Sequence, residues 1–144
     1  MTSTTSTRTD PTSTASDEAL RLEVAARFID GLAARDFDLL AGTLVDEVGF
    51  RALLPSRVLD LKGADAVRST FTTWFGGAER WEVVEAVVGE VGGRVHLRWR
   101  VRLTIPAVGE GTFVVEQQVY ADAAADGRLR DLALLCTGYR PEPS

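Results

Sequence analysis

The sequence predicts an α+β protein in which helices come first and cover one face of an antiparallel sheet. Residues 94–105 alternate apolar and polar side chains without a break, the pattern of a strand with one buried and one wet face. Three further strand-like stretches flank it, joined by short glycine-bearing turns: 81–90, 112–121 and 129–137. The segments before Gly76 instead repeat apolar residues at helical spacing. We therefore expect these helices to pack on the apolar side of the sheet.

The length and composition predict a single domain preceded by a tail. Residues 1–16 read MTSTTSTRTDPTSTAS, in which eleven of sixteen residues are Ser or Thr. Such a segment cannot bury enough apolar surface to offset the entropy of ordering, so we expect it to be disordered. We expect the ordered α+β domain to cover residues 17–141.

Three helices are predicted before the sheet. The first begins at Ser16, a good N-cap, and carries an apolar stripe that repeats every four residues. That stripe is Leu20, Val24, Phe28 and Leu32. Asp36 is placed to cap a shorter second helix that reaches Leu44, and a third helix precedes Gly76. Between the second and third helices, residues 48–54 are predicted to form a short strand that ends at Pro55, because proline lacks the N–H needed for pairing.

The composition excludes several classes of protein. Sixteen basic and 21 acidic residues give a net charge of −5, which argues against a nucleic-acid partner because such proteins carry a basic surface. No apolar run is long enough to cross a membrane, and the N-terminus lacks the apolar centre of a secretory signal, so we expect a cytoplasmic protein. Cys136 is the only cysteine, and His96 has no second histidine with which to bind a metal. We expect no cofactor.

The order of these elements, with the segments at their joints, resembles a known superfamily. The resembling segments are ARFIDGLAARDFDLLAGTLVDEVGFRALLP, LKGADAVRSTFTTWF and VVEQQVYADAAADGRLRDLALLCTGYRP. In this order they resemble the nuclear transport factor 2-like superfamily and, within it, the SnoaL-like branch. The resemblance implies a cone-shaped curved sheet wrapped around three helices, an internal pocket at its open end, and dimerisation through the sheet. Members include ketosteroid isomerase, scytalone dehydratase, limonene epoxide hydrolase, polyketide cyclases and non-catalytic modules, so the fold leaves the function open.

The resemblance also indicates where the catalytic groups of enzymatic members would fall. Ketosteroid isomerase uses a carboxylate base together with a Tyr and a protonated Asp. The Tyr falls on Phe28, the base on Ala52 or Leu54, and the second acid on Gln117. The second acid of limonene epoxide hydrolase falls near Leu134. Scytalone dehydratase uses paired histidines, whereas this sequence has one histidine, His96. We therefore expect a pocket without the usual catalytic acids.

The alternation places the candidate ligand-binding residues inside the sheet. If Trp99 faces inward, the inward residues of the next strand include Gln117 and those of the last strand include Cys136. The predicted pocket is apolar with one amide, which is typical of a small-molecule site. Its ligand-binding candidates are Phe28, Leu54, Trp74, Trp99, Gln117, Val119 and Cys136. Gln117 either orients a ligand carbonyl or satisfies a backbone group, and Glu47 and Tyr139 are the candidates for assisting proton transfer.

The outward residues of the central strand form an arginine stripe, Arg98, Arg100 and Arg102. These like charges repel one another unless a neighbouring strand presents an acidic side chain to them. The alternation of side chains places Glu116 and Gln118 on this same face in the next strand. We expect this face either to be structural or to form the interface of a homodimer. A net-acidic chain offers no supporting field for an anionic ligand there.

Two interpretations of the function remain open. In the first, the protein binds a small cyclic apolar metabolite, polyketide- or steroid-like, and isomerises, cyclises or dehydrates it. In the second, it is a non-catalytic dimerisation or accessory module whose interior is filled. An empty cavity of about 300 Å³ or more favours the first interpretation. A cone closed by Trp74 and Trp99 favours the second.

Overall fold

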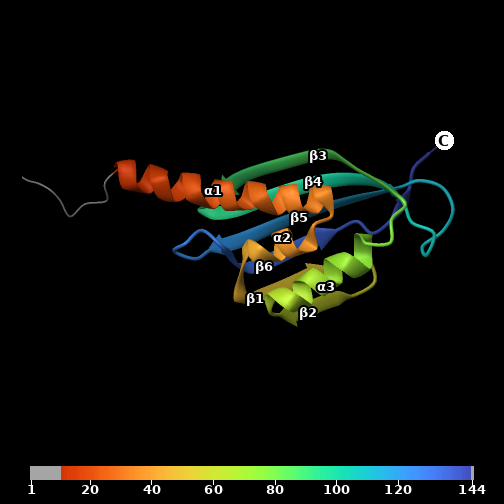
Figure 1. Ribbon diagram of the computed structural model, residues 1–144, viewed down its shortest axis with the longest axis horizontal. Helices are drawn as coiled ribbons and strands as arrows, with labels where there is room; N and C mark the ends of the chain where they lie inside the picture. The colour runs from red at the N-terminus through yellow and green to blue at the C-terminus, as the bar shows by residue number, and fades with distance from the viewer. Residues whose placement is uncertain (1–10, 144) are drawn as a thin grey trace, which may run out of the picture.

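The structure, a computed structural model, describes residues 11–143 and confirms the α+β fold with three helices on one face of a curved sheet (Figure 1). The helices are α1 (Pro11–Ala34), α2 (Phe37–Gly42) and α3 (Ala64–Phe75). The strands are β1 (Leu44–Leu53), β2 (Val58–Lys62), β3 (Arg80–Val91), β4 (Arg94–Thr104), β5 (Phe113–Ala123), β6 (Leu129–Cys136) and β7 (Arg140–Pro141).

The seven strands form one open sheet in the order β2-β1-β6-β5-β4-β3, with β7 paired to β5. All neighbouring pairs are antiparallel except β1 and β6, which run parallel. The register shifts between Val83 and Glu85 in β3 and between Ala121 and Ala123 in β5. Irregularities of this kind bend a strand and increase its twist, which helps the sheet to curve around the helices.

The alternation predicted for the central strand is confirmed. Along β4 every second residue is buried, and Trp99 has no exposed surface, whereas the arginines between them are partly exposed. The same alternation continues in β5, where Gln117 is 2% exposed. The apolar side of the sheet meets the helices in one core, whose largest members include Trp99, Phe28, Phe71, Phe75, Leu32 and Leu97.

The helices follow the predicted pattern with shifted ends. Asp36 caps α2, since its carboxylate accepts a hydrogen bond from the backbone N–H of Leu39 at 3.0 Å. The first helix starts at Pro11 rather than at Ser16, and proline is well tolerated in the first turn of a helix because its missing N–H needs no partner there. Of the tail predicted over 1–16, residues 1–10 lie outside the described residues. Leu44, which the apolar spacing places in the second helix, belongs instead to β1.

Two strands are absent from the prediction. Residues 58–62 have no fully buried position, and their weak apolar alternation does not predict a strand. In the structure they nevertheless pair with β1, from Gly49↔Lys62 to Leu53↔Val58. The two residues of β7 form a strand only because they pair with Phe113 and Val114 of β5. Tertiary pairing of this kind leaves no periodic signal in the sequence.

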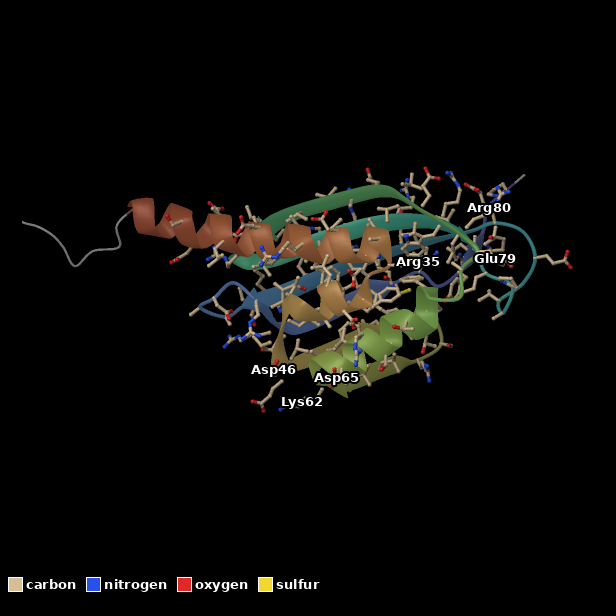
Figure 2. All side chains as sticks on the ribbon, viewed as in Figure 1. Arg35, Asp46, Lys62, Asp65, Glu79 and Arg80 are labelled. Atoms are coloured by element: carbon tan, nitrogen blue, oxygen red, sulfur yellow. The ribbon has the colours of Figure 1, made fainter. Side chains whose placement is uncertain are left out.

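A single arginine ties the end of α1 to the connection between α3 and β3. The Nη1 group of Arg35, labelled in Figure 2, donates to the carbonyls of Phe75 at 3.2 Å and Ala78 at 2.8 Å. Its guanidinium also lies 5.6 Å from the ring centroid of Trp81, whose Nε1–H donates to the carbonyl of Ala33 at 3.0 Å. These contacts hold the helical layer against the sheet at one end of the molecule.

Of the charged side chains labelled in Figure 2, Arg35 is partly buried, whereas Asp46, Lys62, Asp65, Glu79 and Arg80 are exposed. Among residues 11–143, none of the helices has the length and apolar character needed to span a bilayer.

Candidate functional site

A pocket of about 250 Å³, called the mouth pocket here, lies where β6 gives way to β7. Its lining comes from the β1–β2 turn, the end of α3, the middle of β5 and the segment after β6. The lining residues are Leu54, Pro55, Ser56, Arg57, Trp74, Phe75, Val115, Gln117, Cys136, Gly138 and Tyr139. Apolar surface exceeds polar surface in this lining, which suits a small organic ligand.

One wall of the mouth pocket is a tight hairpin turn braced against a glycine. The backbone N–H of Leu54 donates to the carbonyl of Arg57 at 2.9 Å, which closes the turn between β1 and β2. Gly138 has a φ of +74°, and a Cβ at this position would lie 2.9 Å from Cγ of Pro55. Only glycine satisfies both this backbone conformation and this close approach without strain. The turn is therefore seated directly on the segment that follows β6.

Gln117 presents a fixed amide to the pocket. Its Oε1 accepts a hydrogen bond from Nε1 of Trp99 at 2.9 Å, and its Nε2 donates to Sγ of Cys136 at 3.2 Å. The indole N–H can only donate, so the amide oxygen must face Trp99 and the NH₂ group must face the other way. The buried tryptophan thus determines which end of the amide is available at the pocket.

Two other polar groups of the lining, the Cys136 sulfur and the Tyr139 hydroxyl, are already engaged with the protein. The Cys136 sulfur also accepts the backbone N–H of Gly138 at 3.3 Å, and the Tyr139 hydroxyl donates to the carbonyl of Trp74. Burial, followed by the nearby Cys136, raises the pKa of Tyr139 above its usual value. The phenol therefore stays protonated at neutral pH and acts as a donor to the end of α3.

The deeper interior of the cone is filled by aromatic rings. Phe28 and Phe71 have no exposed surface, and their ring centroids lie 5.9 Å apart. Trp99 packs against both, with centroids 5.6 Å from Phe28 and 6.4 Å from Phe71. The sequence left open whether the interior is an empty cavity or is closed by aromatic rings. In the structure the deep interior is closed by these rings, and a smaller hollow remains at the mouth.

Four of the residues predicted to bind a ligand line the mouth pocket together: Leu54, Trp74, Gln117 and Cys136. The other three, Phe28, Trp99 and Val119, are fully buried in the core behind it. Of the two candidates for proton transfer, Tyr139 lines the pocket, whereas Glu47 is exposed on β1 and does not.

Arg57 and Gly138 could not be predicted as site residues, because residues 55–57 and 137–139 lie in connections without periodicity. The available signal was the Pro-Ser-Arg run directly after a predicted strand, which marks a turn. Arg57 is the only charged residue of the lining. Within residues 11–143 no group of His, Cys, Asp and Glu side chains is arranged to hold a metal ion.

The outer face of the sheet carries the arginine stripe, and each of its arginines has an acidic partner in the same chain. The Nε of Arg100 donates to Glu116 at 2.6 Å, as the parity of the two strands predicts. Arg98 lies 3.7 Å from Glu85, and Arg102 contacts Glu142 at 2.8 Å and Glu82 at 3.2 Å. Gln118 contacts His96 at 3.1 Å. These pairs remove the repulsion within the stripe.

A curved open sheet over three N-terminal helices is the architecture of nuclear transport factor 2-like proteins. The chain matches the SnoaL-like domain over residues 25–132 and belongs to that family. The comparison with curated proteins found no match.

Solved structures show the same fold in distant relatives. A protein described as a polyketide cyclase from Xanthomonas campestris pv. campestris superposes with a TM-score of 0.66 and 17% identity, covering 83% of this chain and 91% of the other. Bal32a from a soil-derived mobile gene cassette gives 0.68 and 17%, covering 85% and 92%. A protein described as a ketosteroid isomerase from Kribbella flavida gives 0.55 and 20%, covering 89% and 86%. At these identities the likeness concerns the fold.

Proposed function

We propose that this protein binds a small cyclic, largely apolar ketone in the mouth pocket, with the NH₂ group of Gln117 donating a hydrogen bond to the ligand carbonyl. The observation that carries the proposal is the orientation of this amide, whose oxygen is held by Trp99. The names of the fold neighbours, polyketide cyclase and ketosteroid isomerase, support a cyclic ketone as the ligand class.

The donor on Gln117 is available for a ligand. An amide nitrogen carries two hydrogens, and among residues 11–143 the single partner of Nε2 is the Cys136 sulfur at 3.2 Å. Sulfur is a weak acceptor, so a carbonyl oxygen competes well for this group. Because Trp99 already fixes the amide, binding costs little reorganisation.

The size and lining of the pocket limit the ligand and its chemistry. A hollow of about 250 Å³ lies just below the usual range for drug-sized ligands, which favours a compound of about one or two rings. The lining residues include no Asp, Glu or His. We therefore propose that the pocket binds its ligand without proton transfer by a carboxylate. Of the two interpretations, this favours an accessory ligand-binding module over an isomerase.

The test of the Gln117 donor is a comparison of two ligands in two proteins. We measure the ratio of the affinity for 2-acetylnaphthalene to that for 2-isopropenylnaphthalene in each protein. This ratio should be about fivefold lower in Gln117→Leu than in wild type, because one net hydrogen bond contributes about 1 kcal/mol. Ligand-observed NMR titrations measure both affinities. The hydrocarbon has the shape of the ketone without its oxygen, so the ratio cancels any general change in the pocket.

Gln117→Leu also leaves the indole N–H of Trp99 without its acceptor, which costs about 1–3 kcal/mol of stability. Titrations are therefore made well below the melting temperature of the variant. An unchanged ratio of ketone to hydrocarbon affinity removes Gln117 from the ligand site. Failure of wild type to bind either compound contradicts the proposed function itself.

We also propose that the outer face of the sheet pairs with a second copy of the chain. The helices cover the opposite face (Figure 1), and the outer face presents basic β4 between acidic residues of β3 and β5, a self-complementary pattern.

We expect Glu116→Arg to convert a dimer into a monomer in analytical ultracentrifugation. Asp46→Arg makes the same charge reversal on exposed β1 and should keep the dimer; a dimer in both variants places the interface elsewhere.

A further inference from the structure

We infer that the ligand of the mouth pocket is a carboxylate-bearing ring compound whose carboxylate is bound by Arg57; this inference rests on the proposed function and adds the charge of the ligand to it. Arg57 is the only charged residue of the lining, and no Asp or Glu lies beside it there. The lining thus carries one positive charge, at an exposed residue, and no carboxylate to oppose it.

The position of Arg57 is defined by the hairpin turn rather than by a mobile loop. Leu53 and Val58 pair on either side of the turn, and the hydrogen bond from Leu54 to the Arg57 carbonyl closes it. The close approach of Pro55 to Gly138 seats the turn on the opposite wall. The backbone that carries the guanidinium is therefore held at the rim, which lowers the entropy lost when an anion binds.

The charge of Arg57 is not used within the described part of the chain. Whereas Arg98, Arg100 and Arg102 each lie within 4 Å of a carboxylate, Arg57 forms no such ion pair with residues 11–143. A planar guanidinium matches the two oxygens of a carboxylate and binds them with parallel hydrogen bonds. Apart from this group and the amide of Gln117, the lining is formed mainly by apolar residues, including Leu54, Trp74 and Phe75. This distribution fits a ring with a ketone at one end and a carboxylate at the other.

The experiment compares an acid with its neutral isostere. The probes are 3- and 4-acetylbenzoate and the corresponding acetylbenzamides, which share one shape and differ in charge. We expect wild type to bind the better of the two acids about fivefold more tightly than its amide at low ionic strength, the upper range for a rim-exposed ion pair. Calorimetric titration measures both affinities. The preference should fall when salt is raised to about 0.5 M, where charges are screened over a few ångströms.

Two variants assign the preference to a residue. Arg57→Gln should bind acid and amide with equal affinity and so lose the preference that wild type shows. Arg51→Gln removes the same charge from the same hairpin, but Arg51 is exposed outside the lining, so this variant should keep the preference. Both positions are exposed, and unchanged melting temperatures will show that both variants fold.

The outcomes separate the inference from the function on which it rests. Equal binding of acid and amide by wild type overturns the inference and leaves the proposed ketone site intact. A preference that persists in Arg57→Gln also overturns it, because the anion is then bound elsewhere. Absence of binding for all four probes, together with the naphthalene ketone, overturns both.

Discussion

Trp99→Ala is expected to lower the free energy of unfolding by about 3–5 kcal/mol, the cost of removing a large aromatic side chain from a closed core. The side chain is fully buried and packs against Phe28 and Phe71. It also donates the hydrogen bond that orients Gln117, so its removal leaves a buried amide oxygen without a donor. Urea unfolding followed by circular dichroism measures the change.

A matched variant separates the two contributions of Trp99. Trp99→Phe keeps an aromatic ring in the core and removes the indole N–H, so we expect a loss of about 1–2 kcal/mol. The ketone preference should weaken in this variant as well, since the amide of Gln117 is free to turn. A loss below about 1.5 kcal/mol for Trp99→Ala would contradict the closed aromatic core, because only a loosely packed or collapsible site tolerates such a deletion.

Gly31→Ala is expected to destabilise the protein by about 2 kcal/mol, although alanine has a higher helix propensity than glycine. Gly31 lies in α1 where it meets α2, and a Cβ there would lie 2.8 Å from the backbone nitrogen of Leu40 and 3.0 Å from the carbonyl oxygen of Asp36. These are backbone atoms and cannot rotate away, so α2 must shift as a unit. Thermal unfolding by calorimetry, at matched protein concentration, measures the effect.

Gly42→Ala is the control for this prediction. It makes the same substitution at the end of α2, where no atom lies within 4 Å of the new Cβ and the backbone is not left-handed. We expect it to be neutral or to stabilise by up to about 1 kcal/mol, because alanine restricts the unfolded chain more than glycine does. Equal effects of the two substitutions would show that α1 and α2 do not meet at Gly31 as described.

The fold could be predicted from the sequence to the extent that burial is periodic. The strict alternation around Trp99 fixes both faces of β4, and neighbouring strands inherit that parity through pairing, which is why the Arg100–Glu116 contact could be predicted. The helical stripe through Phe28 carried the same kind of information for α1. The short edge strand β2 could not be predicted in this way, since it has no fully buried face.

The candidate site was predictable in part for the same reason. Gln117 and Cys136 followed from parity, because they lie in regular strands at paired positions. Parity alone could not separate Val119, which is sealed in the core, from residues at the mouth, since both face inward. Arg57 and Gly138 reach the pocket from connecting segments, and the position of such a segment in space depends on contacts between distant parts of the chain.

The place of β6 in the sheet has a consequence for how the polypeptide acquires its structure. In the hydrogen-bonded order, the β2–β1 hairpin joins the other strands through β6, which is the last long strand in the chain. During synthesis, therefore, the early hairpin and the β3–β4–β5 meander cannot join into one sheet until residues 129–136 arrive to pair with both. Such sequence-distant pairing slows folding and exposes unpaired edges meanwhile.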